Sequence, residues 1–155
     1  MSISTRIGLV ICAVSAVLLA STVDSSAGGR DALGFRAGMS AGPDQFVLGG
    51  QGEWGPVLDA TYMVPSLDFG FQDPNTAIAN FDFRWYLARL PETGIRFYGA
   101  AGPTLVMSPS TELGVSLTVG MHIPMKAQRR YNVEMRFGLG DIPDVKILGA
   151  LMFGI

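Results

Sequence analysis

Apolar and polar residues alternate along this chain from Gly34 to its end. The pattern is clearest in Leu113–Pro124, where Leu117 and Val119 fall on one face and Gly, Ser and Thr residues fall on the other. A period of two is the period of a β-strand, because successive side chains of a strand point to opposite faces. No stretch after Ala27 shows a helical period. The alternation therefore predicts strands that each have one apolar and one polar face.

Turn residues divide this region into eight runs. Pro and Gly cluster between the runs, as in Gly42-Pro43-Asp44 and Gly55-Pro56, because Pro presets one backbone dihedral and Gly tolerates positive φ. Pro65 interrupts the third run and cannot donate a ladder hydrogen bond, so we expect a bulge or kink there. The expected strands cover residues 33–42, 45–54, 57–72, 76–90, 94–107, 112–124, 130–140 and 144–155.

The connections between the runs are short, which favours antiparallel neighbours in an up-and-down meander. An open meander leaves two unpaired edges, and closure removes them. We therefore predict an all-β fold, a single closed antiparallel up-and-down β-barrel of eight strands, in residues 28–155.

The first residues form a separate segment. Met1–Arg6 carries one arginine, Ile7–Ala20 is an almost unbroken apolar run, and Ser25-Ser26-Ala27 offers small residues at a cleavage site. This is the layout of a secretory signal peptide. The run has 14 residues, whereas a transmembrane helix needs about 20. We expect a signal peptide helix in Met1–Ala27, with an uncleaved membrane anchor as the alternative.

Composition limits the partners and the chemistry. The one cysteine, Cys12, lies in the signal segment, so the mature chain can form neither a disulfide nor a thiolate metal site. The net charge is −2 and no basic patch indicates a nucleic-acid partner. Charged residues make up 15% of the chain, against about 25% in soluble domains, and Lys126 and Lys146 are the only lysines. So little charge is unusual for a surface in water.

The polar face indicates which side points outward. It carries many small residues and both signs of charge, which suit the crowded interior of a narrow barrel. Eight strands leave an interior that side chains can fill, and buried charges must be paired, so we expect a plugged lumen rather than an open pore. The predicted lumen network is Arg36, Glu53, Asp82, Arg84, Arg96, Glu134 and Arg136. The residues predicted to face lipid are Phe81, Phe83, Trp85, Leu117, Val119, Val133 and Phe137.

Two further patterns concern the ends of the barrel. Aromatic residues fall toward strand ends, where membrane barrels carry aromatic girdles: Trp54, Tyr62, Trp85, Phe97, Tyr131 and Phe153. Acidic residues lie in or beside the turns expected at one end, and basic residues lie at the other. The acidic set is Asp44, Asp73, Glu112, Asp141 and Asp144, and the basic set is Arg89, Lys126, Arg129 and Arg130.

With these features the chain resembles the small eight-stranded outer-membrane β-barrel proteins of Gram-negative bacteria, the OmpX/OmpW-like group. The resemblance covers the signal segment and all eight strands. Val145–Ile155 is similar to the last strand that the barrel-insertion machinery recognises in that family, although Ile155 replaces the usual terminal aromatic and Phe153 lies two residues earlier. The resemblance implies a location in the cell outer membrane, contact with its lipid, and no particular activity.

Candidate chemistry is sparse. His122 is the only histidine, and catalysis on a hydroxyl would require a serine paired with it. No serine lies within two residues of His122, and Ser116 is six residues away on the same face. No phosphate loop, nucleophile elbow or metal-ligand spacing occurs. We therefore expect no catalytic residues, no cofactor and no metal.

The sequence predicts an integral outer-membrane protein with a structural or envelope-maintenance role. Two alternatives remain open at this point. One is a soluble periplasmic barrel that binds an apolar ligand inside, as lipocalin-like proteins do. The other is a lateral passage for small apolar molecules through the wall of a membrane barrel, at a gap near Pro65.

Overall fold

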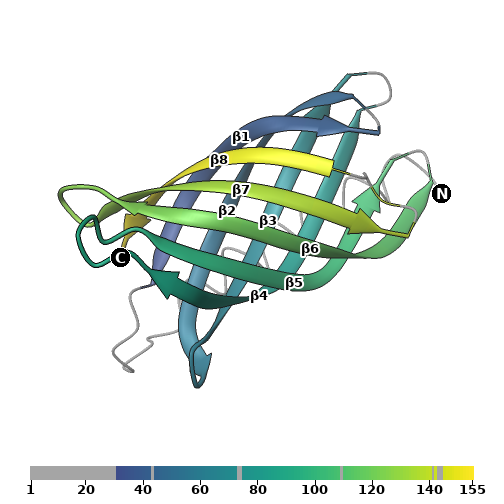
Figure 1. The fold of residues 1–155 in the computed structure, drawn as a ribbon. Helices are drawn as coiled ribbons and strands as arrows, with labels where there is room; N and C mark the ends of the chain where they lie inside the picture. The colour runs from purple at the N-terminus through teal and green to yellow at the C-terminus, as the bar shows by residue number, and fades with distance from the viewer. Residues whose placement is uncertain (1–30, 43, 73–74, 109, 141, 143–144) are drawn as a thin grey trace.

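The computed structural model describes residues 31–42, 44–72, 75–108, 110–140, 142 and 145–155. In this part of the chain eight antiparallel strands close into one barrel (Figure 1). The predicted fold class is confirmed. The signal segment Met1–Ala27 lies outside the described residues. The strands are β1 (Ala32–Ala41), β2 (Gln45–Leu58), β3 (Thr61–Phe71), β4 (Thr76–Arg89), β5 (Arg96–Met107), β6 (Thr111–Pro124), β7 (Arg129–Leu139) and β8 (Val145–Gly154).

The barrel closes through its first and last strands. β1 and β8 pair without a register shift from Ala32 opposite Gly154 to Ala41 opposite Val145. Buried and more exposed side chains alternate along β4, β7 and β8, because one face points into the barrel and the other away from it. Closure therefore gives every described strand two partners and leaves no open sheet edge. None of the described segments is a helix of the length and apolarity needed to cross a membrane.

The β2–β3 connection differs from the prediction. The sequence placed a turn at Gly55-Pro56, but β2 continues to Leu58 and the chain reverses at residues 59–60. The register of the two strands shifts between Trp54 and Leu58, and Pro56 lies in this irregular stretch. A proline is tolerated there because its missing N–H removes no regular ladder bond.

No register shift occurs at Pro65, where the sequence predicted a bulge or kink. β3 keeps one register against β2 from Phe71 to Met63, and one against β4 throughout, with Pro65 opposite Phe81. The irregularities lie elsewhere, at residues 54–58 of β2 and between Tyr86 and Ala88 of β4. On the β4 side the ladder therefore runs through Pro65, whereas on the β2 side the pairing passes from Gln51–Ser66 to Trp54–Met63 without pairs at Pro65 and Val64.

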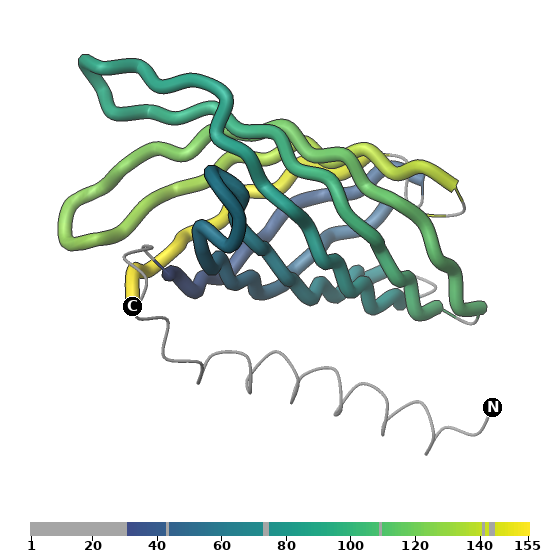
Figure 2. Tube along the Cα trace, turned by 90° about the horizontal axis from the view of Figure 1, so that it is seen from below, coloured from purple at the N-terminus to yellow at the C-terminus, as the bar shows by residue number. Residues whose placement is uncertain are grey.

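The two ends of the barrel are built differently. The β2–β3, β4–β5 and β6–β7 turns lie at the end that also holds the start of β1 and the end of β8. Figure 2 shows the β4–β5 and β6–β7 hairpins projecting at this end, where the C-terminus lies. We call it the terminal end. The other four turns lie at the opposite end, so the predicted separation of acidic Asp44 and Glu112 from Arg89 and Arg129 follows from the topology.

Candidate functional site

Charged and polar side chains fill the middle of the barrel. Alternation along each strand aims them inward, and closure buries them. Six of the seven residues predicted for the lumen network are at most 2% exposed. These six are Arg36, Glu53, Asp82, Arg84, Glu134 and Arg136.

Arg84 connects two carboxylates from opposite sides of the interior. Its guanidinium donates to Glu53 Oε2 at 2.5 Å and to Glu134 Oε1 at 2.7 Å. Tyr98 donates its hydroxyl to the same Glu134 oxygen at 2.8 Å, and the Arg84 guanidinium lies 4.0 Å from the centre of the Tyr98 ring. Glu53, Arg84 and Glu134 come from β2, β4 and β7, so this cluster crosses the lumen.

Two further arginines continue the network toward the opposite end. Arg36 makes two hydrogen bonds to the Asp68 carboxylate, one from Nε and one from Nη2, and lies 3.7 Å from Glu134. Arg136 donates to Asp82 Oδ2 at 2.6 Å and to Ser116 at 3.0 Å. Each buried guanidinium therefore has a carboxylate partner, which offsets the large desolvation cost of a buried charge.

Sequence reasoning placed one residue wrongly in this network and missed another. Arg96 is half-buried at the terminal end, over the Tyr86 ring, and has no carboxylate within ion-pair distance among the described residues. Asp68 is the missed partner, fully buried beside Arg36. Asp68 alternates with the apolar residues Leu67 and Phe69, which places it on the polar face of its strand. The break expected at Pro65 left undetermined whether this polar face continues the inner face of the residues before it.

An apolar cluster lies in the interior near the opposite end. Ile78, Val106 and Ile142 form a buried cluster. Gly114 lies beneath Ile142, since a Cβ on Gly114 would come within 2.7 Å of the Ile142 side chain. The interior near this end thus combines an apolar cluster with buried polar side chains such as the hydrogen-bonded Gln45 and Thr76, and the middle is charged.

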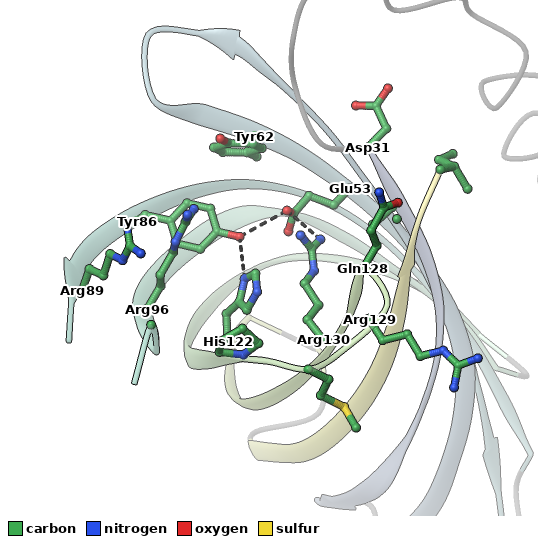
Figure 3. Close-up of a pocket in the computed structure, with 16 residues that line it drawn as sticks. Asp31, Glu53, Tyr62, Tyr86, Arg89, Arg96, His122, Gln128, Arg129 and Arg130 are labelled. Atoms are coloured by element: carbon green, nitrogen blue, oxygen red, sulfur yellow. Dashed lines mark hydrogen bonds and ion pairs between the residues drawn. The ribbon is translucent and has the colours of Figure 1, made fainter. Parts of the chain in front are cut away.

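A cavity of about 710 Å³ lies at the terminal end, and we call it the vestibule. Figure 3 shows Glu53 and Arg130 meeting in it, with Tyr62, Tyr86 and His122 around them. Arg89, Arg96 and Arg130 line it with the carboxylates of Asp31 and Glu53, and Arg129 borders it with its guanidinium 5.6 Å from the centre of the Phe153 ring. The vestibule therefore carries an excess of positive charge.

Glu53 links the vestibule to the lumen network. Its Oε1 atom pairs with Arg130 at 2.7 Å and accepts a hydrogen bond from the Tyr86 hydroxyl at 3.2 Å. The same hydroxyl lies 3.3 Å from Nδ1 of His122. His122 points inward, as the sequence indicated, and the partner that the structure describes for it is a tyrosine rather than a serine. Tyr62, expected in an outer girdle, instead packs edge-on against Tyr86, with ring centres 5.3 Å apart.

The outside of the barrel is apolar. Large exposed apolar side chains occur on all eight strands, including Phe35 on β1 at 77% and Leu113 on β6 at 72% exposure. All seven residues predicted to face lipid point outward. Phe81, Phe83, Trp85, Leu117, Val119 and Phe137 are exposed, and Val133 is half-exposed.

Among the described residues no three His, Cys, Asp or Glu side chains gather in a way that could hold a metal ion.

The fold matches that of known membrane barrels. The N-terminal β-barrel domain of OprF from Pseudomonas aeruginosa has a TM-score of 0.62 and 12% identity, over 81% of this chain and 96% of that one. Neisserial surface protein A has a TM-score of 0.60 and 9% identity, over 81% of this chain and 94% of that one. The outer membrane protein Ail of Yersinia pestis has a TM-score of 0.52 and 7% identity, over 82% of this chain and 100% of that one. No family model and no curated protein sequence matches the chain. At these identities the likeness shows that the chain has the fold of small eight-stranded outer-membrane β-barrels.

Proposed function

We propose that this chain is an integral outer-membrane protein with a structural or envelope-maintenance role, a side-chain-filled lumen and no catalytic activity. The observation that carries the proposal is the arrangement of the two faces. Large apolar side chains are exposed on every strand, while arginine–carboxylate pairs occupy the interior. A soluble monomer rarely exposes a contiguous apolar surface larger than a few hundred Å², whereas lipid accepts one all round the barrel.

The proposal includes the route to the membrane. The Met1–Ala27 segment would direct export, and Val145–Ile155 would be recognised by the barrel-insertion machinery. Residues 28–155 would then form one domain in contact with outer-membrane lipid. We place the terminal end, with the vestibule, on the periplasmic side, which turns the end holding Asp44 and Glu112 outward.

The alternatives gain no support from the interior or the wall. A lipocalin-like carrier needs an apolar ligand cavity, but paired charges occupy the lumen and arginines line the vestibule. A lateral passage needs a gap in the wall, but β3 stays paired with β4 from Thr61 to Gly70, Pro65 included, and keeps one register with β2 on both sides of Pro65.

The membrane assignment predicts the behaviour of the protein during extraction. The mature protein should sediment with outer membranes, require detergent for extraction, and run faster on a gel unheated than after boiling, because a closed barrel stays compact in the detergent until heat unfolds it. Fractionation followed by paired heated and unheated gel lanes measures this. Recovery of a folded monomer in buffer without detergent would reject the assignment.

The filled lumen predicts the absence of a conductance. The purified protein in a planar bilayer should show no steady single-channel current, because the Arg84, Arg36 and Arg136 clusters occupy the interior and apolar side chains lie beyond them. A porin reconstituted in the same bilayers serves as the positive control. A stable current that persists at low protein concentration would contradict a plugged barrel.

A further inference from the structure

The vestibule holds a row of basic residues that the lumen network does not use. Arg89, Arg96 and His122 lie opposite one another on β4, β5 and β6, since Arg89 pairs with Arg96 and Arg96 pairs with His122 in the ladders. Like charges directly opposite each other destabilise a sheet. No carboxylate among the described residues lies within ion-pair distance of Arg89 or Arg96. The pair is therefore uncompensated within the described part of the chain.

A local irregularity creates this pair. Tyr86 faces Tyr98 across the β4–β5 ladder, but the register shifts by one residue before Ala88, which then faces Phe97. Without the shift, alternation would carry Ala88 to the inner face and Arg89 to the outer one. The shift brings Arg89 opposite Arg96, and both line the cavity. Bulges commonly re-aim a side chain in this way, often next to a functional site.

The rest of the vestibule completes a site for an organic anion. Arg130 adds a third guanidinium, ion-paired to Glu53, and Tyr86 and Tyr62 offer aromatic surface beside it (Figure 3). Arg96 lies over the Tyr86 ring at 5.5 Å, so charge and aromatic surface adjoin. A cavity of about 710 Å³ falls in the range of small-molecule sites, roughly 300 to 1,000 Å³.

We propose that the vestibule binds a small organic phosphate, with the phosphate monoester between Arg89 and Arg96 and the organic part against Tyr62 and Tyr86. Guanidinium groups bind phosphate through two parallel hydrogen bonds, and a dianion would neutralise both uncompensated arginines. An excess of positive charge around a concave space also concentrates anions there. The phosphate monoester could belong to a soluble molecule or to a lipid headgroup, which share this chemistry.

Calorimetric titration of the refolded mature barrel, in nonionic detergent free of phosphate, tests the proposal. Phenyl phosphate should bind saturably, and benzyl alcohol, its neutral counterpart, should not. Arg96→Gln should weaken binding about tenfold, because it removes a charge-assisted hydrogen-bond donor. Lys126→Gln is the matched control, since it removes one positive charge at the same end from a residue that does not line the cavity.

A second arm separates the two sources of phosphate. Short-chain phosphatidic acid added to the micelles should compete with phenyl phosphate if both enter the vestibule. Arg96-dependent binding of either probe alone supports the site and identifies the source. Arg89→Gln, at an exposed position, repeats the test if Arg96→Gln does not give the folded gel band. Failure of both probes to saturate, equal weakening by Arg96→Gln and Lys126→Gln, or equal binding of benzyl alcohol would overturn the proposal. If the barrel folds as a soluble monomer without detergent, the same titration is carried out in plain buffer. Failure of the membrane assignment therefore does not decide whether the vestibule binds a phosphate.

Discussion

Replacing Arg84 by methionine is expected to destabilise the folded barrel by about 3 to 5 kcal/mol, the range for removing one partner of a buried ion pair. Arg84 is fully buried and pairs with both Glu53 and Glu134. Its loss leaves those two buried carboxylates with less charge compensation. Urea unfolding of the barrel in lipid vesicles, followed on gels, measures the change.

A double-mutant cycle shows whether the charges act as a unit. Arg84→Met combined with Glu134→Met should cost less than the two single losses together, by about 0.5 to 3 kcal/mol, because the second substitution removes a carboxylate that the first left unpaired. Arg89→Met, at an exposed position of the rim with no ion pair among the described residues, should stay within about 0.5 kcal/mol of the parent. Additive losses, or an effect of Arg84→Met no larger than that of Arg89→Met, would mean that water compensates the lumen charges.

Replacing Leu117 by arginine is expected to destabilise the barrel in vesicles by about 2 to 4 kcal/mol, the cost of a cation on the lipid face at the bilayer midplane. Leu117 lies halfway along β6, points outward and is 45% exposed. In the proposed orientation its side chain contacts lipid tails. The same urea unfolding in vesicles measures the loss.

Leu113→Arg on the same strand is the matched control. Leu113 lies near the start of β6 and is more exposed than Leu117, so an arginine there reaches the interface and should cost about 0 to 1 kcal/mol. A soluble barrel would tolerate arginine at both exposed positions, within about 0.5 kcal/mol. Equal and small effects at the two positions would therefore argue against burial of this wall in lipid.

The sequence was informative about strands because their period is local. Alternation and turn residues predicted all eight strands, the closed barrel, and the faces of residues such as Arg84 and Phe83. The errors came at two prolines, which were interpreted by the usual preference of proline for turns and strand breaks. Gly55-Pro56 looks like a turn but lies inside β2, and Pro65 looks like a break but stays paired with β4 and interrupts only the β2–β3 pairs.

The candidate sites depended more strongly on tertiary structure. Alternation alone determined that Arg36, Glu53 and Glu134 share the inner face of a barrel. It could not determine that Arg36 pairs with Asp68, 32 residues away, or that Arg84 joins Glu53 to Glu134, since these contacts depend on register between strands far apart in sequence. The vestibule was decided in the same way. One register shift in β4, which no local sequence pattern predicts, places Arg89 beside Arg96, and closure of β1 on β8 brings Glu53 of β2 to Arg130 of β7 in the same cavity.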